Sequence, residues 1–198
     1  MTIVDLIRHG EPVGGRRYRG QQDDPLSDKG WQQMWSAVDG QQPWDVIVTS
    51  TLSRCRDFAW ALGQRLDIDV IEDTRIVEIG FGEWEGRTGA EICRDEPDRL
   101  QRFFQDPVAE RPAGAETLAD FSSRVDAAWA DLLQHYAGRH VLVVTHAGVI
   151  RAITSRVLGM PIEHMFRLQV GNAGLSRIEV GGERPPVLHV HNGRLLSA

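Results

Sequence analysis

Two histidines in this chain each follow a short apolar run, a position from which they could act together on an anion. Arg8, His9 and Gly10 come directly after the run 3–7, and His146 follows the second run, 141–145. Apolar runs of this length, closed by a glycine, are typical of buried strands, and open α/β sheets bind ligands at the carboxyl ends of their strands. There an imidazole can attack as a nucleophile while a guanidinium holds anionic oxygens in pairs. The two segments therefore predict a site for chemistry on an anionic group.

The composition is that of an ordinary globular enzyme. Of the 198 residues, 41% are hydrophobic and 25% are charged, which fits one domain with a full core over 1–198. The net charge of −6 argues against a nucleic-acid-binding protein, but a pocket with local positive charge could still take a phosphate. Two cysteines, Cys55 and Cys93, make no disulfide framework. We find no apolar stretch of transmembrane length and no signal peptide, so we expect a cytoplasmic protein without a membrane partner.

The elements that must position these residues alternate between strand and helix. This order predicts a three-layer α/β/α sandwich with a mostly parallel central sheet. Helices are expected after the caps Ser27 and Thr117, and the segment 81–116 reads as a lid, with a capping box at Thr88 and a further helix from Pro97. The expected strands are 3–7, 46–49, 70–71, 140–145, 175–180 and 187–190, and the other two helices are 53–66 and 147–157.

Four segments in order resemble the motifs of the histidine phosphatase superfamily, whose fold is also called phosphoglycerate-mutase-like. Together they span about residues 3 to 160, and four ordered motifs are far more specific than any one of them. The segments are Leu6-Ile7-Arg8-His9-Gly10-Glu11, Val48-Thr49-Ser50-Thr51-Leu52-Ser53-Arg54, Glu78-Ile79-Gly80-Phe81-Gly82-Glu83-Trp84-Glu85-Gly86 and Val144-Thr145-His146-Ala147-Gly148-Val149.

The resemblance implies catalytic roles for five residues. His9 would be the nucleophile that carries the phosphoryl group, and Arg8 and Arg54 would clamp its oxygens. His146 would be the second histidine of the site, at the start of a helix whose N–H groups favour an anion. Glu78 would protonate the leaving oxygen and then activate water. Glu11, Glu83 and Glu85 compete for this acid role, and we expect them to be solvated or capping carboxylates instead.

Three departures from the family pattern affect the expected substrate contacts. Pro12 replaces the usual Thr or Ser, Thr51 replaces a proline, and Gly15 replaces an Asn whose amide contacts phosphate in many relatives. We therefore expect the substrate to be held by Arg8, Arg54, His146 and the backbone of Ala147, with a backbone N–H at Gly15 or the side chain of Arg16 in place of the missing amide.

The expected partner is a small phosphomonoester, with no metal and no other cofactor. His189 and His191 share one strand face but lack an accompanying acidic or cysteine cluster, and His135, His140 and His164 are expected at the surface. A hairpin formed by the last two strands could pair across a homodimer.

Within the superfamily, the length and the segment Gly14–Gly20 resemble the α-ribazole phosphatases, which remove a 5′-phosphate during cobalamin nucleotide-loop assembly. The aromatic residues Phe81, Trp84, Phe103 and Phe104 could stack on a benzimidazole ring or simply form core. The alternatives are a sugar phosphatase or a phosphoglycerate-mutase-like enzyme and, in another class, a catalytically silent binding or scaffold protein on the same fold.

Overall fold

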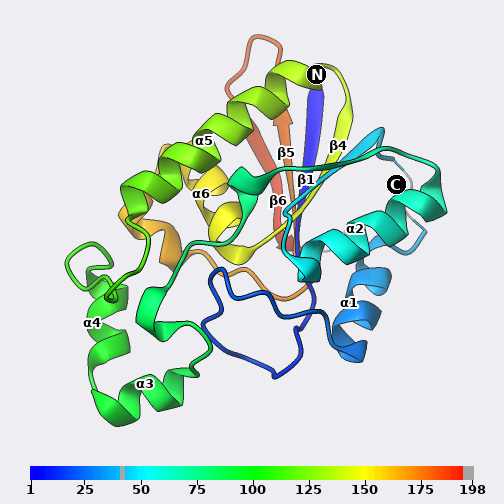
Figure 1. Cartoon of the computed structure of the whole chain (residues 1–198). Coiled ribbons are helices and arrows are strands. Elements are labelled where there is room, and N and C mark those ends of the chain that lie inside the picture. Colours follow the sequence, from blue (N-terminus) through cyan, green and yellow to red (C-terminus); the bar gives the residue numbers. More distant parts are fainter. Residues whose placement is uncertain (41–42, 194–198) are drawn as a thin grey trace.

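The computed structural model describes residues 1–40 and 43–193, and a six-stranded sheet lies at its centre (Figure 1). The strand order is β3-β2-β4-β1-β5-β6. The first four strands in this order run parallel to one another. β5 pairs antiparallel with β1, and β6 pairs antiparallel with β5. The predicted α/β sandwich with a mostly parallel sheet is confirmed. The strands are β1 (Thr2–Arg8), β2 (Val46–Thr49), β3 (Val70–Glu72), β4 (His140–Thr145), β5 (Leu175–Val180) and β6 (Val187–Gly193).

Helices cover both faces of the sheet (Figure 1). One face carries α1 (Asp28–Val38) and α2 (Ser53–Leu66), and the other carries α5 (Leu118–His135) and α6 (Ala147–Val157). Successive residues of a strand point to opposite faces, so β4 sends Val141 and Val143 into the core under α5 and α6. Its Leu142 and Val144 enter the core under α1 and α2. This double burial explains why the central strands are continuous apolar runs without a polar alternation.

The helices begin where the sequence places their caps. Ser27 accepts a hydrogen bond from the N–H of Gly30, and Thr117 accepts one from the N–H of Asp120. At Thr117 the reciprocal bond of a capping box is absent, because the Asp120 carboxylate accepts from the Thr117 hydroxyl instead of from the backbone. The inward face of α1 is centred on Met34 and Val38, and Trp31 and Trp35 are only partly buried beside it.

The segment 81–116 forms short helices around a core of its own. Its elements are the 3₁₀ turn η2 (Gly82–Trp84), α3 (Gly89–Asp95) and α4 (Arg99–Gln105). The turn η1 (Thr74–Ile76) precedes it in the chain, and η3 (Ile162–Arg167) follows α6. The predicted capping box at Thr88 and Glu91 is present. The later helix begins at Arg99 and not at Pro97 as predicted, after Asp98 in its N-cap position.

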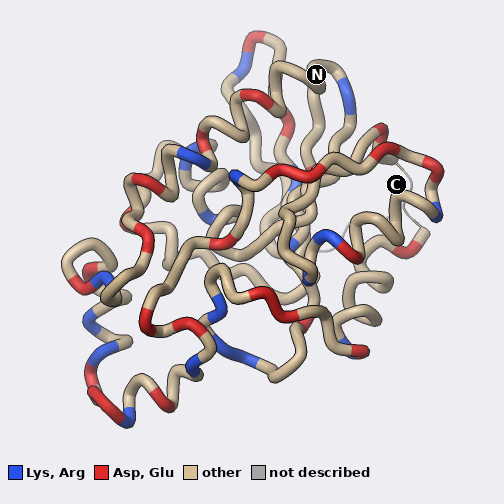
Figure 2. The backbone as a smooth tube through the Cα atoms, in the orientation of Figure 1, with Lys and Arg blue, Asp and Glu red and all other residues tan. Residues whose placement is uncertain are grey.

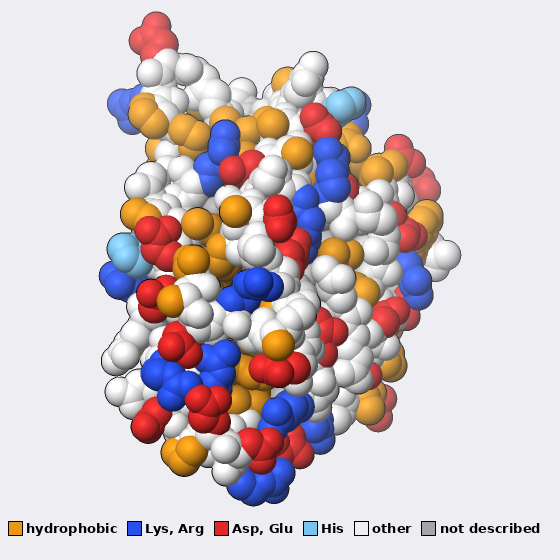
Figure 3. All heavy atoms as spheres, turned by 60° about the vertical axis from the view of Figure 1, so that its left-hand side comes forward, with side chains coloured by type: hydrophobic (Ala, Val, Ile, Leu, Met, Phe, Trp, Pro, Cys, Tyr) orange, Lys and Arg blue, Asp and Glu red, His pale blue; other side chains and the backbone are white. Residues whose placement is uncertain are grey.

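Three buried side chains, Trp84, Ile92 and Phe103, form the core of this segment, and Phe166 of η3 packs against them. Acidic and basic side chains are interspersed over the lower part of the surface in Figure 3. Within the segment 81–116, Arg99 and Arg102 both pair with Glu110. The charges of these arginines are thus balanced within the segment.

A buried carboxylate on β1 ties three distant elements together. Asp5 is fully buried and accepts hydrogen bonds from Trp44 Nε1 (2.8 Å), His140 Nε2 (2.9 Å) and the Nε and Nη2 atoms of Arg177 (2.7 and 2.9 Å). Burial alone would raise the pKa of Asp5, but the hydrogen bonds from Arg177, His140 and Trp44 outweigh it and lower that pKa. His140 is therefore a partly buried structural residue and not the surface histidine that the sequence predicted.

No helix in the described residues is long and apolar enough to cross a membrane.

We expect Asp5→Asn to lower the free energy of unfolding by about 2–4 kcal/mol at pH 7, because it leaves Arg177 without its anionic partner. Urea denaturation measures this loss, with Asp98→Asn as a control at an exposed aspartate whose side chain makes no cap hydrogen bond. Since the folded state lowers the pKa of Asp5, the stabilisation is present above the ordinary Asp pKa of about 4 and is lost as the pH falls. The wild type and the variant should converge in acid, and an equal gap at every pH would contradict this account.

Candidate active site

The pairing of β1 with β4 brings the two histidine motifs together. Arg8 and Thr145 are partners in the parallel ladder, and the N–H of His9 donates to the carbonyl of Thr145 at 2.9 Å. On the other side of β4, the N–H of Ser50 donates to the carbonyl of Val144 at 3.0 Å. The next side chains, His9 and His146, therefore meet above the sheet edge, with ring centroids 5.2 Å apart.

The geometry of His9 leaves one ring nitrogen free. Its Nδ1 lies 2.7 Å from the carbonyl oxygen of Gly10, which can only accept, so Nδ1 carries the proton of a neutral ring and Nε2 keeps its lone pair. Only 5% of His9 is exposed, and this burial, followed by the positive charges of Arg8 and Arg54, lowers the pKa of His9 well below its ordinary value. An imidazole held neutral with a free Nε2 is suited to nucleophilic attack.

His146 is fully buried beside it. The Ser50 hydroxyl lies 2.7 Å from His146 Nε2, and Cys55 Sγ lies 3.6 Å from the same nitrogen. Burial and the charge of Arg54 lower the pKa of His146 well below its ordinary value too. The sequence did not point to Ser50 and Cys55 as neighbours of the site, although Ser50 stands in the motif that contains Arg54.

Arg8 and Arg54 are both anchored by backbone carbonyls and have no carboxylate partner among the described residues. Arg8 Nη1 donates to Val170 at 2.7 Å, and the two Nη atoms of Arg54 donate to Gln22 and Gly20, each at 2.7 Å. The Nε atom of each guanidinium is buried without a hydrogen-bond partner. Burial lowers the pKa of Arg8 to about 10, which still leaves it charged at neutral pH. The buried guanidinium of Arg54 and the partly buried guanidinium of Arg8, both without a carboxylate partner in the described residues, form a ready anion site near His9.

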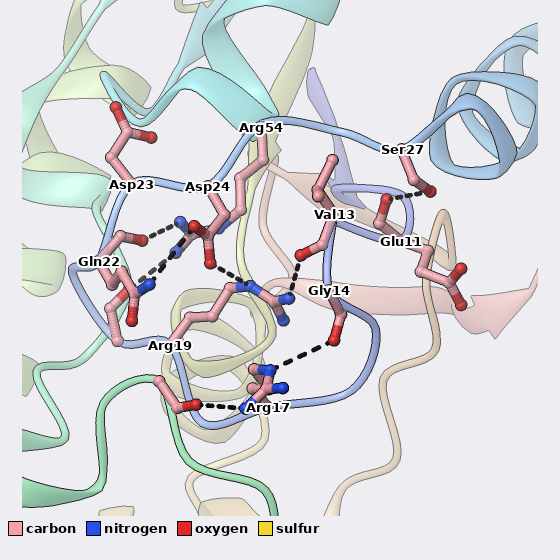
Figure 4. A network of polar contacts seen from close by, with 12 residues as sticks. Glu11, Val13, Gly14, Arg17, Arg19, Gln22, Asp23, Asp24, Ser27 and Arg54 are labelled. Carbon is pink, nitrogen blue, oxygen red and sulfur yellow. Dashed lines mark hydrogen bonds and ion pairs between the residues drawn. The ribbon is translucent and has the colours of Figure 1, made fainter.

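The loop between β1 and α1 holds Arg54 through a network of polar contacts (Figure 4). Arg19 is buried between the Asp24 carboxylate (2.9 Å) and the Val13 carbonyl (2.7 Å), so it braces the loop. Along the chain, the three arginines of this loop lie between Glu11 on one side and Asp23 and Asp24 on the other, and Figure 2 shows basic and acidic stretches close together here. Gly15 has a positive φ of 71° with open space where a Cβ would stand, and the neighbouring Arg16 is exposed. The structure therefore leaves the predicted substrate contacts of Gly15 and Arg16 as predictions.

Glu78 contacts the amino terminus of α6, the helix that begins directly after His146 in the chain. Its Oε1 accepts hydrogen bonds from the N–H groups of Ile79 (2.9 Å) and Gly148 (3.1 Å). A Cβ at position 148 would lie 2.2 Å from that oxygen, so the glycine of this motif is needed to let the carboxylate approach. Backbone N–H groups at two helix starts are thus already used within the protein: Glu78 accepts from the N–H of Gly148 in α6, and Asp23 accepts from the N–H of Ser53 in α2.

The three competing glutamates have structural partners. Glu85 Oε1 accepts from the N–H groups of Phe81 (2.9 Å) and Gln21 (3.1 Å), and Glu11 pairs with Lys29 at 3.0 Å. Glu83 is exposed. Glu78 is the one of the four that lies at the start of α6, beside the two histidines.

The aromatic residues and the remaining histidines divide between core and surface. Trp84 and Phe103 are buried in the core of the segment 81–116 and cannot stack on a ligand without rearrangement, while Phe104 is 50% exposed. His135 is exposed on α5, and His189 pairs with Glu179 on the edge hairpin. No group of three or more potential metal ligands occurs in the described residues.

Comparison with known proteins identifies the family pattern over almost the whole chain. The model of the histidine phosphatase superfamily (branch 1) matches residues 4–193. A bifunctional protein of Mycobacterium tuberculosis is 33% identical over 90% of this chain, and the chain spans only 50% of that protein's length. A probable phosphoglycerate mutase of Citrobacter koseri is 31% identical over 90% of the chain and 85% of its own length. Phosphoserine phosphatase 1 of Hydrogenobacter thermophilus is 29% identical over 96% and 92%.

Solved structures share the whole fold. A mycobacterial glucosyl-3-phosphoglycerate phosphatase superposes with a TM-score of 0.87 at 29% identity, over 98% of this chain and 99% of its own. The α-ribazole phosphatase of Shigella flexneri superposes with a TM-score of 0.82 at 27% identity, over 99% and 98%. These relatives act on different phosphate esters by name, so the likeness gives the fold and the family without one substrate.

The two buried histidines should make the protein less stable as the pH falls below about 6.5. The unfolded chain binds protons there while the folded site keeps both rings neutral, so each histidine costs about 1.4 kcal/mol of stability per pH unit until its lowered pKa is reached. His9→Gln and His146→Gln should each flatten this slope between pH 7 and 5 in denaturation experiments. His135→Gln, at an exposed position, should keep it; an unchanged slope in all three variants would contradict the neutral assignment.

Proposed function

The chain belongs to the histidine phosphatase superfamily and is a phosphoric monoester hydrolase, and we propose that it works through a phosphohistidine formed on His9. One observation carries this proposal: a neutral His9 with a free Nε2 lies near the buried Arg54 and the partly buried Arg8, which have no carboxylate partner in the described residues. A phosphoryl group seated between these guanidiniums would supply the missing anion and present its phosphorus to Nε2.

In the first step, Nε2 of His9 forms a bond to phosphorus as the bond to the leaving oxygen breaks. Arg8, Arg54 and His146 stabilise the negative charge on the phosphoryl oxygens, and the backbone at Ala147 lies at the same end of α6. In the second step, water attacks the phosphohistidine, inorganic phosphate leaves, and His9 is restored. No metal or other cofactor takes part in these steps.

Glu78 is the proposed proton carrier. It gives its proton to the leaving oxygen in the first step and takes one from the attacking water in the second. Its contact with the N–H of Gly148 supports this role, because it fixes the carboxylate at the helix end that follows His146. The lid segment 81–116 would limit access of water and determine which leaving groups fit.

The loop 14–20 favours α-ribazole 5′-phosphate as one substrate to test. The Shigella flexneri relative carries that activity in its name. Sugar phosphates and 3-phosphoglycerate are the other candidates, and the names of the glucosyl-3-phosphoglycerate and phosphoserine phosphatases support phosphate esters of small acids.

His9→Ala should abolish turnover of p-nitrophenyl phosphate, with a loss of at least about 10³-fold in kcat, because the covalent step has no other nucleophile. The wild type should also retain a labelled phosphoryl group that is labile in acid, after rapid quenching. His164→Ala, a change outside the site, is the control. Activity that survives in His9→Ala would overturn the mechanism, and a wild type without activity on any phosphomonoester would favour a silent binding protein.

Glu78→Gln should lose much more activity on an alkyl phosphate than on p-nitrophenyl phosphate. An alkoxide needs a proton as it leaves, whereas p-nitrophenolate leaves without one, so we expect losses of about 10³-fold and about tenfold in the first step. Single-turnover rates on both substrates measure the difference. Glu83→Gln is the matched control at an exposed glutamate, and equal losses on both substrates would contradict the acid role.

A further inference from the structure

Arg151 lies on the face of α6 that looks over the candidate active site. It follows Gly148 by three residues and Ala147 by four, and residues at these spacings stand above one another on a helix. Its Nε donates to the carbonyl of Leu168 at 2.9 Å, two residues from the Val170 carbonyl that anchors Arg8. One short segment after η3 therefore holds both guanidiniums.

The other side of Arg151 faces the lid segment. Its guanidinium lies over the ring of Phe166, 5.7 Å from the centroid, and Phe166 packs on Phe103 and Phe104 of α4. Arg151 thus stands between the phosphoryl site and the lid, where the leaving group of a bound substrate would lie.

Partly buried arginines elsewhere in the molecule have carboxylate partners. Arg99 pairs with Glu110, Arg124 with Glu116 and Arg177 with Asp5, at 2.7–2.8 Å. Within the described residues, Arg151 makes no ion pair, and its one hydrogen bond goes to a carbonyl. In this it resembles Arg8 and Arg54, and charged side chains that are withdrawn from water are rarely left without a counter-charge.

The charges around the site are unevenly balanced. Burial lowers the pKa of Arg151, and Glu78 and Tyr18 are the groups that act against this lowering. Arg151 in turn adds to the positive field that lowers the pKa of Arg8. A phosphoryl dianion held by Arg8 and Arg54 would balance the charges of these two arginines. The positive charge of Arg151 would then need a second anion as its partner.

We propose that Arg151 binds a carboxylate on the leaving group, so that the substrate is a phosphate ester of a small hydroxy acid. This inference rests on the proposed function and chooses among its substrates: it favours 3-phosphoglycerate-like esters over α-ribazole 5′-phosphate, whose leaving group carries no anion. The planar guanidinium can bind both carboxylate oxygens at once.

Two pairs of substrates isolate the carboxylate. Glycerol 3-phosphate carries a hydroxymethyl group where 3-phosphoglycerate carries its carboxylate. Phosphoethanolamine is phosphoserine without the carboxylate. We expect wild-type kcat/KM to be at least about tenfold higher for the acid of each pair. Arg151→Met should lower it about 10- to 100-fold for the acids and less than about threefold for the others, mainly through KM.

Three further measurements serve as controls for this test. Arg156→Met changes an arginine on the same helix that pairs with Asp126 at 3.1 Å, and it should leave both ratios unchanged. Arg151→Lys should recover part of the preference. Calorimetric binding of 3-phosphoglycerate and glycerol 3-phosphate to His9→Ala should show the same discrimination without any turnover.

The failures are distinct. Equal losses on acid and neutral esters in Arg151→Met would make Arg151 a structural or phosphoryl-binding residue and overturn the inference. A wild type that prefers the neutral member of each pair, or α-ribazole 5′-phosphate, would also overturn it while leaving the phosphatase mechanism intact. Absence of turnover on p-nitrophenyl phosphate would instead refute the proposed function, and the calorimetric comparison would then decide on Arg151 alone.

Discussion

The parallel pairing of β1 with β4 is the constraint on which the site depends. These two central strands are more than 130 residues apart in the chain, and their register sets Arg8 beside Thr145, so that the residues that follow each strand share one sheet edge. Every other contact of the site builds on this alignment. Ser50 reaches His146 because β2 lies on the far side of β4, and Glu78 reaches Gly148 because α6 starts where β4 ends. A shift of one residue in the ladder would reverse the side chains of a strand and separate the histidines.

The site combines arginines that keep their positive charge with histidine rings that remain neutral. Arginine keeps its charge even where burial lowers its pKa, as at Arg8, whereas the same burial removes the proton from His9 and His146. The arginines reinforce this difference by repelling a second positive charge on the rings. The result is a permanently positive site around an uncharged nucleophile, at the cost of stability in mild acid. That cost is a common feature of functional sites, which are not optimised for folding alone.

Much of the fold could be predicted from the sequence because its signals are local. Strand runs, the caps Ser27 and Thr117 and the capping box at Thr88 each depend on neighbouring residues. What the sequence did not reveal depends on contacts across the chain. His140 looked like a surface residue because nothing near it in sequence marks Asp5 as its partner, and the helix-end N–H groups looked free because the approach of Glu78 and Asp23 is tertiary. Trp84 and Phe103 looked available to a ligand for the same reason, since only the folded lid segment shows that they fill its core.

Arg151 illustrates how far local reasoning could have gone. Its spacing from Ala147 and Gly148 places it on the site face of a helix, which the sequence alone indicates, but a helical arginine is most often a solvated or salt-bridged residue. Its unpaired state is visible only when the partners of the other partly buried arginines are known. The same reasoning that assigns Arg8 and Arg54 to a phosphoryl group then applies to the third arginine: a charge withdrawn from water implies a counter-charge, and where the protein supplies none, the substrate must. Specificity in this fold would then lie in the number of such unmatched charges around a shared nucleophile, which a few substitutions on α6 or the lid could change without disturbing the catalytic edge of the sheet.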